Sequence, residues 1–139
     1  MTTNSVKTVF NKNMAFTSTI NGHELRMDTT AEDGGDDSGP SPKRLMLASL
    51  AGCTGIDIVS ILNKMKVEFS DLNIDVDAQL TEEHPKYYNK VKINYSIKLN
   101  VADHSKMEKA VALSQDKYCG VAAMFKTFAT LETEIIFLN

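Results

Sequence analysis

Two cysteines are the residues of this chain that could take part in the widest range of reactions. Cys53 lies in the middle of the nearly all-apolar stretch GPSPKRLMLASLAGCTGIDIVSIL, and Cys119 lies in QDKYCGVAAMF. A cysteine thiolate is a nucleophile that can be oxidised or can form a disulfide. A free cysteine is also among the most buried residue types and often serves only as a small hydrophobe. The position of Cys53 inside an apolar helix favours simple burial on composition alone, whereas the two interpretations are balanced for Cys119.

The predicted surroundings of the two thiols differ. Cys119 falls near the start of a predicted short helix, where unpaired N–H groups and the helix dipole lower the pKa of a thiol. Because the thiolate is the reactive form, Cys119 is a candidate reactive thiol on this ground. Ser49 and Asp57 lie one turn before and one turn after Cys53 on its helix face. A neighbouring carboxylate raises the pKa of a thiol, so Asp57 is not expected to activate Cys53.

Spacing gives no metal or cofactor motif. The cysteines are 66 residues apart, which is not the short spacing of a metal-binding pair. His23, His84 and His104 have no cysteine or carboxylate at ligand spacing and are expected to be solvated. The chain has no Gly-rich phosphate loop, no H-E-x-x-H and no G-x-S-x-G sequence. The sequence therefore predicts no metal and no bound cofactor, and the two thiols are the remaining candidates for chemistry.

Length and charge limit the classes of function. A chain of 139 residues is long enough for one domain and short for two, so residues 1–139 are expected to form a single domain. The formal net charge is −3 and the 15 basic residues are scattered, which argues against a nucleic-acid partner. The N-terminal residues lack the pattern of a secretory signal. We expect a cytoplasmic protein whose cysteines are free thiols or a transient redox pair.

The elements that must position Cys53 begin with one long helix. Ser41 and Pro42 form a helix start, and no residue stops the helix before about Lys66. Its apolar residues occupy more than one face, so most of its surface should be covered. A membrane span over residues 45–62 is disfavoured, because Asp57 and several hydroxyl residues interrupt that stretch.

A stripe of small residues follows this helix, with Ala48, Gly52 and Gly55 at positions i, i+4 and i+7. Glycine inside a helix costs about 1 kcal/mol relative to alanine, so two of them imply close packing. The partner could be a helix of a second subunit or the later helices of the same chain, and the periodicity leaves both open.

The remaining elements are predicted from local patterns. Runs of β-forming residues around Asn21-Gly22 predict an N-terminal antiparallel meander over residues 7–30, followed by an exposed Gly/Asp/Ser/Pro loop. Alternating residues 72–80 and 91–101 predict a β-hairpin. Two shorter helices, from about residue 103 and over residues 118–126, and a final strand over residues 129–137 complete an α+β fold.

Two motifs together resemble the OsmC/Ohr family of osmotically inducible and organic hydroperoxide resistance proteins, in its OsmC-like branch. The first is Leu-x-x-Ala-Ser-Leu-Ala-Gly-Cys, ending at Cys53 and continuing through Asp57-Ile58-Val59-Ser60-Ile61-Leu62. The second is Asp116-Lys117-Tyr118-Cys119, leading into a helix. The predicted order of elements also follows that family over nearly the whole chain.

The resemblance implies an OsmC-like fold in an intertwined homodimer, with two long central helices packed together and an active site at the subunit interface. In the peroxidase members, the cysteine matching Cys53 attacks a hydroperoxide and becomes a sulfenic acid. The cysteine matching Cys119 then forms a disulfide with it, and a dithiol or a protein-bound lipoyl group restores both thiols. This scheme needs no bound cofactor and no metal.

Two positions depart from the pattern of the peroxidase members. Those members carry a Glu directly after the proline that opens the long helix, where this chain has Lys43 followed by Arg44. They also carry an activating Arg in the loop between the first two strands, where this chain has NKNMAF. Lys12, Lys43 or Arg26 could supply a charge instead. Arg44 is disfavoured, because nine residues along one helix span about 13 Å.

Two functions from different classes follow. The leading hypothesis is a thiol-dependent peroxidase that reduces organic hydroperoxides in oxidative or osmotic stress defence, with Cys53 peroxidatic and Cys119 resolving. The apolar side chains expected around Cys53 favour organic hydroperoxides over hydrogen peroxide as substrates. The alternative is a non-catalytic stress protein, or a dimer that binds small apolar ligands, which keeps the fold and the cysteines without the activating pair.

Overall fold

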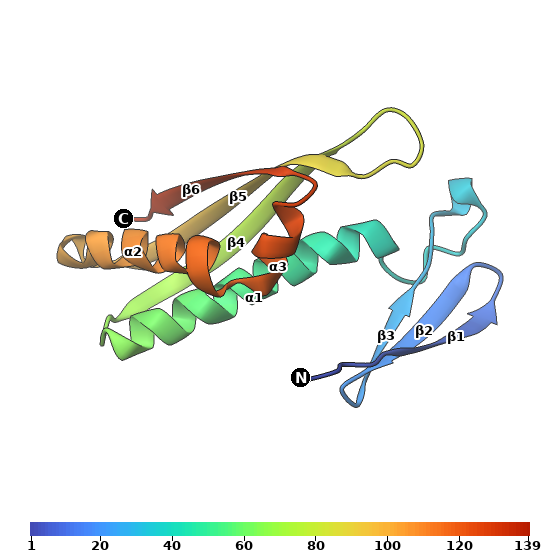
Figure 1. Ribbon diagram of the computed structural model, residues 1–139, viewed down its shortest axis with the longest axis horizontal. Coiled ribbons are helices and arrows are strands. Elements are labelled where there is room, and N and C mark those ends of the chain that lie inside the picture. The colour runs from blue at the N-terminus through green and yellow to red at the C-terminus, as the bar shows by residue number, and fades with distance from the viewer. The chain divides into compact units, whose positions relative to one another are not determined.

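The computed structural model describes residues 1–139, and they form two compact units, residues 1–46 and residues 47–139 (Figure 1). Six strands and three α-helices follow the order β1–β2–β3–α1–β4–β5–α2–α3–β6. Each unit contains one three-stranded sheet. The predicted α+β class and the predicted order of elements are confirmed, while the expectation of a single domain stays a prediction.

The first unit contains the antiparallel meander of β1 (Lys7–Lys12), β2 (Ala15–Ile20) and β3 (His23–Met27). Asn21 and Gly22 connect β2 to β3 and both have positive φ, +55° and +82°, as a tight hairpin turn requires. Exposed residues dominate the meander, and no residue of β1 is buried. The unit therefore contributes little to the hydrophobic core of the chain.

The loop after β3 folds around the carboxylate of Asp28. This carboxylate accepts hydrogen bonds from the backbone N–H groups of Thr29, Asp36 and Ser38, and from the Ser38 hydroxyl at 2.5 Å. These bonds lower the pKa of Asp28 to about 2, with the Ser38 hydroxyl as the largest cause. A Cβ at Gly35 would lie only 2.2 Å from the carbonyl oxygen of Thr29, so the loop needs glycine there. The predicted exposed loop thus has a defined internal structure.

The second unit contains the sheet β4–β5–β6, made of β4 (Phe69–Leu80), β5 (Tyr88–Leu99) and β6 (Thr130–Phe137). The hairpin β4–β5 is antiparallel, and β6 pairs with β5 in parallel. Along β5, Val91, Ile93, Tyr95 and Ile97 are buried, whereas alternate residues such as Lys92 are exposed. One face of the sheet therefore meets the core and the other faces solvent, as the alternating pattern predicts.

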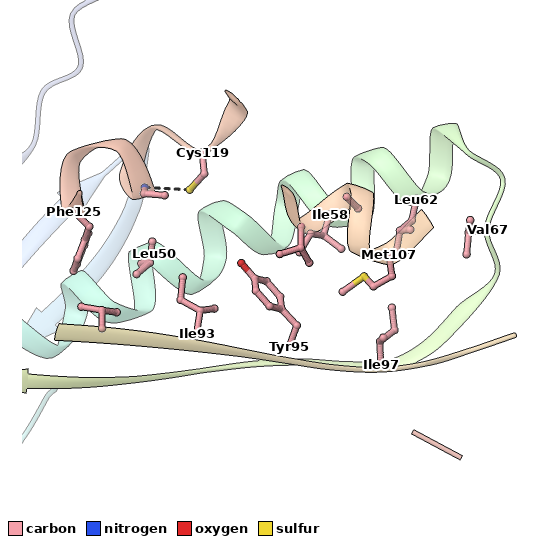
Figure 2. Close-up of a cluster of buried hydrophobic side chains, with 14 of the residues drawn as sticks. Leu50, Ile58, Leu62, Val67, Ile93, Tyr95, Ile97, Met107, Cys119 and Phe125 are labelled. Carbon is pink, nitrogen blue, oxygen red and sulfur yellow. Dashed lines mark hydrogen bonds between the residues drawn. The ribbon is translucent and has the colours of Figure 1, made fainter. Parts of the chain in front are cut away.

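Helices cover the buried face of this sheet (Figure 1). They are α1 (Pro42–Lys64), α2 (His104–Leu113) and the short α3 (Gly120–Phe125), with a π-helical turn at Ser114–Tyr118 between the last two. Figure 2 shows Leu50, Ile58 and Leu62 of α1 lying over Ile93, Tyr95 and Ile97 of the sheet. This layer forms the hydrophobic core and fixes the position of α1.

One side of α1 is left exposed by the packing within residues 47–139. Ala48, Ser49, Gly52, Ile56 and Ser60 are exposed at helical spacing, and Ile56 retains 73% of its accessible surface. The helix is long and apolar enough to cross a membrane by length and composition, but a single helix of this kind is weak evidence of a span. The predicted distribution of apolar residues over several faces of the helix is confirmed, and the elements of residues 47–139 leave one of these faces exposed.

The two glycines of the small-residue stripe lie in different environments. A Cβ at Gly55 would meet Cδ1 of Ile74 on β4 at 3.0 Å, whereas a Cβ at Gly52 would meet nothing within 4 Å. Gly55 thus allows close approach of the sheet, and neither a later helix nor a second subunit is needed to explain it. Ala48 and Gly52 remain available to another molecule.

His104 differs from the sequence-based expectation. It is half-buried at the start of α2, and its ring stacks on Phe137 with ring centroids 3.7 Å apart. The prediction of a solvated side chain is therefore wrong for His104, because β6 brings Phe137 beside it. His23 and His84 are exposed as predicted.

Candidate active site

Cys53 lies near the middle of α1, on the side of the helix that borders the core. It is half-buried and packs against the hydrophobic cluster that includes Leu50 and Ile58. Because α1 is held by the sheet along much of its length, the position of the Cys53 thiol is fixed by tertiary packing. Cys53 is not fully buried, as a reaction with an external molecule requires.

Cys119 is held at the junction of the π-helical turn and α3. Its N–H donates to the carbonyl oxygen of Ser114 at 2.8 Å, and its Sγ accepts a hydrogen bond from the N–H of Ala122 at 3.3 Å (Figure 2). Cys119 is thus the N-cap of α3, in place of the oxygen-bearing residues that usually cap helices. It retains only 4% of its accessible surface.

The fold brings the two thiols together, although 66 residues separate them in the sequence. The Sγ atoms of Cys53 and Cys119 and a carboxylate oxygen of Asp57 all lie within 4.8 Å of one another. Both cysteines are free thiols. The two predicted site residues therefore lie close together, and Asp57 lies beside both of them.

Burial sets the ionisation of Cys119. Desolvation is the largest effect and raises the pKa of Cys119, whereas the hydrogen bond from the N–H of Ala122 lowers it. Cys53 and Asp57 also raise it, and all these effects together give a pKa of about 11. The expectation of a lowered pKa at Cys119 is therefore wrong: the helix N-terminus is present, but burial outweighs it.

A chain of hydrogen bonds connects Asp57 to buried hydroxyl groups next to the two cysteines. The Thr54 hydroxyl lies 2.8 Å from the Tyr95 hydroxyl and 2.7 Å from the Ser114 hydroxyl. Ser114 donates to Oδ2 of Asp57 at 3.0 Å, and the side-chain amide of Gln115 donates to the Tyr95 hydroxyl at 2.9 Å. The network joins α1, β5 and the π-helical turn, so it fixes the carboxylate of Asp57 relative to both cysteines.

The hydroxyl groups of Thr54, Tyr95 and Ser114 were not predicted from the sequence to be part of the site. The signals were polar residues in apolar patterns: Thr54 directly after Cys53, and Tyr95 on the buried face of β5. Ser114, just after α2, is also fully buried. Each signal is weak alone, because only the fold shows that the three hydroxyls meet.

A surface pocket of about 330 Å³ opens beside the site. Asp57 lines it together with Ile61, Met65 and Leu113, and Ser60, Lys64 and Tyr118 complete its wall. The pocket is therefore apolar for much of its lining and carries one carboxylate and one ammonium group. It gives small molecules a path to Asp57.

The cations considered as activators lie in the first turn of α1 or in the N-terminal strands. Lys43 is the second residue of α1, and Lys12 ends β1. Arg26 on β3 donates to the Ser38 hydroxyl at 2.8 Å and to Asn11 at 3.4 Å. Arg26 is thus already engaged with neighbours in its own unit, and activation by these residues stays a prediction.

Comparison with known proteins supports the resemblance seen in the motifs. The family model described as OsmC-like protein matches residues 35–134. Protein YhfA of Escherichia coli K12 is 30% identical over 105 residues, which cover 76% of this chain and 75% of that protein.

Solved structures agree in fold. A hypothetical protein from Aquifex aeolicus VF5 is 28% identical with a TM-score of 0.82, and the similarity covers 100% of both chains. An organic hydroperoxide resistance protein OsmC from Legionella pneumophila is 17% identical with a TM-score of 0.69, over 98% of both chains. At that identity the second similarity concerns the fold alone. Because the family model covers most of the chain, this protein belongs to the OsmC-like family.

Proposed function

We propose that this protein is a thiol-dependent peroxidase that reduces organic hydroperoxides in stress defence, with Cys53 as the peroxidatic and Cys119 as the resolving cysteine. The observation that carries the proposal is the approach of the two Sγ atoms to within 4.8 Å. Membership of a family that includes organic hydroperoxide resistance proteins supports the choice of substrate.

The reaction divides into three balanced steps. The deprotonated sulfur of Cys53 attacks the terminal oxygen of ROOH, so the O–O bond breaks, Cys53 becomes a sulfenic acid and ROH leaves after protonation. The thiol of Cys119 then attacks the sulfur of Cys53, which forms the disulfide and releases water. An external dithiol, such as a lipoyl group, reduces the disulfide and is itself oxidised.

The environments of the cysteines suit these roles. Cys53 is the more exposed thiol and can meet the hydroperoxide first, whereas Cys119 is buried beside it. An S–S bond is about 2.05 Å long, so the sulfurs must approach further during resolution. Cys119 lies at the start of a helix of only six residues, which can shift more easily than α1. The apolar residues around Cys53 favour an organic hydroperoxide.

A homodimer completes the proposal. The uncovered side of α1 includes Ala48 and Gly52, where another helix could approach closely, and the highly exposed Ile56. Two copies of α1 packed along this side would remove apolar surface from water. The dimer would act in the cytoplasm, where dithiol reductants are available.

The test is the intact mass of the reduced protein before and after one equivalent of cumene hydroperoxide, followed by peptide mapping. The expected result is the rapid loss of two hydrogens, mapped to a link between Cys53 and Cys119. The Cys119→Ser variant should instead gain one oxygen on Cys53. The Cys53→Ser variant should not turn over hydroperoxide with a dithiol reductant.

Circular dichroism of both variants provides the folding control, since serine is close to cysteine in size. Equal peroxidase activity in the wild type and in Cys53→Ser would contradict the proposal. An unchanged mass after treatment of the reduced wild type would contradict it as well.

A second candidate function is the binding of small apolar ligands without catalysis. The pocket beside Asp57 favours it, because Ile61, Met65 and Leu113 provide an apolar lining. The departure at Lys43 from the pattern of the peroxidase members is in accord with it. A mass unchanged by hydroperoxide, together with saturable binding of an apolar fluorescent probe that Ile61→Asp abolishes, would select this function.

A further inference from the structure

The grouping of Cys53, Asp57 and Cys119 has a second chemical use. Two sulfurs and one carboxylate oxygen within 4.8 Å of one another form a donor set suited to a thiophilic divalent cation. We propose that the reduced protein binds one Zn²⁺ per chain through Cys53, Cys119 and Asp57, with the fourth position open to water. This inference does not rest on peroxidase activity, because binding requires only the reduced thiols.

The donor atoms are close to the arrangement that zinc requires. Zinc–sulfur bonds of about 2.3 Å in a tetrahedron place two sulfurs about 3.8 Å apart. The present limit of 4.8 Å therefore requires a contraction of about 1 Å or less. Cys53 and Asp57 are half-buried, and rotation of their side chains can supply it. Cys53 and Asp57 are also one helical turn apart, so both point to the same side of α1.

Charge favours a cation at this position. Two thiolates and a carboxylate cannot all be ionised at this separation without strong mutual repulsion. A divalent cation removes the repulsion, and the balance is Zn²⁺ plus two thiols giving a zinc dithiolate and two released protons. The carboxylate of Asp57 completes three ligands and leaves one formal negative charge on the site.

The surroundings contain the supporting shell that metal sites commonly have. Ser114 donates to Oδ2 of Asp57 at 3.0 Å. The Thr54 hydroxyl lies 2.7 Å from that of Ser114, and the Tyr95 hydroxyl lies 2.8 Å from that of Thr54. One oxygen of the carboxylate is thereby fixed, and in this proposal the other oxygen binds the metal. The pocket of about 330 Å³ that Asp57 lines gives access to this residue.

Cobalt(II) is the probe, because it takes the place of zinc in tetrahedral sulfur sites and absorbs light there. The reduced full-length protein, free of metal, is titrated with Co²⁺ without oxygen. The expected result is a thiolate-to-cobalt charge-transfer band that saturates at one Co²⁺ per chain and disappears when Zn²⁺ is added. Cys53→Ser and Cys119→Ser should each lose most of this band.

Two further variants test the carboxylate and its support. Asp57→Ala should weaken Co²⁺ affinity at least about tenfold, and Ser114→Ala about tenfold, while the exposed Asp75→Asn on β4 should leave it unchanged. Circular dichroism confirms that each variant is folded. Absence of the charge-transfer band in the wild type, or a band that survives Cys53→Ser or Asp57→Ala with full affinity, would overturn the proposal.

The result is distinguishable from a failure of the peroxidase proposal. Metal binding is measured without any peroxide, and the mass test of the disulfide is made without any metal. Binding of Co²⁺ without any reaction with cumene hydroperoxide would support the zinc site and contradict the peroxidase proposal. Formation of the disulfide without any charge-transfer band would support the peroxidase proposal and contradict the zinc site.

Discussion

Burial and a hydrogen bond act in opposite directions on the thiol of Cys119, and burial is the larger effect. The N–H of Ala122 stabilises the thiolate, as expected at a helix start, but desolvation and the neighbouring Cys53 and Asp57 disfavour it. The pKa of Cys119 rises to about 11 as a result. A resolving cysteine that stays protonated until the sulfenic acid forms beside it would not compete with Cys53 for hydroperoxide.

Alkylation by iodoacetamide tests whether burial raises the pKa of the Cys119 thiol. With a pKa of about 11, only about one Cys119 thiol in a thousand is ionised at pH 8, and its reaction is slow. We expect Cys53 to be alkylated first, because it is more exposed, and the rate at Cys119 to rise about tenfold per pH unit from pH 8 to pH 10. Peptide mapping at successive times measures both rates.

Denatured protein is the matched control, since both cysteines should then react at similar rates. Alkylation of native Cys119 at pH 8 as fast as that of Cys53 would show that burial does not protect this thiol.

At the scale of the element, the loop after β3 shows how one carboxylate organises a segment with little secondary structure. Asp28 retains 3% of its accessible surface and accepts hydrogen bonds from Thr29, Asp36 and Ser38. Its pKa in the folded protein, about 2, is lower than the ordinary value of 3.8. The folded state therefore binds this proton less readily than the unfolded state does.

The Asp28→Asn variant should lose the ordering of this loop. Because the folded pKa is the lower one, the stabilisation is fully present above pH 3.8 and is lost as the pH falls towards 2. Hydrogen exchange at the N–H groups of Asp36 and Ser38 should be faster in the variant at pH 6, and the two proteins should converge near pH 2. The neighbouring Asp36→Asn, whose side chain is exposed, is the control. Equal exchange in wild type and Asp28→Asn at pH 6 would contradict this role.

At the scale of the whole molecule, the side of α1 that carries Ala48 and Gly52 is exposed, and packing within residues 47–139 does not explain the glycine at position 52. Gly52 costs about 1 kcal/mol of helix stability relative to alanine, and a Cβ there would meet nothing within 4 Å. Gly55 on the same helix is explained by Ile74 of the sheet. A second copy of α1 packed on Ala48 and Gly52 would explain why position 52 is a glycine.

The Gly52→Leu variant tests the dimer. A leucine side chain would separate two closely packed helices, so we expect the variant to sediment as a monomer at concentrations where the wild type is a dimer. Ala112→Leu, at an exposed position of α2, should leave the wild-type assembly unchanged. Analytical ultracentrifugation measures all three proteins. A dimeric Gly52→Leu variant, or a monomeric wild type, would contradict the predicted packing.

Local patterns were enough to predict most elements of the fold. The Asn21-Gly22 turn, the alternating hairpin and the Ser41-Pro42 helix start each act over a few residues, so the sequence contains the whole signal. The π-helical turn at Ser114–Tyr118 was not predicted, and it ends at Cys119. Its conformation depends on the contacts of Ser114 with Thr54 and Asp57, which lie about sixty residues away in the sequence.

The sequence by itself determined the class of the fold, the order of its elements and the identity of the two thiols, because these depend on residue type and short-range pattern. Only the tertiary structure decided that Cys53, Cys119 and Asp57 lie within 4.8 Å of one another. It also decided that burial raises the pKa of Cys119 and that Gly55 faces the sheet. Each of these depends on desolvation or contact between distant segments, which spacing along the chain does not record.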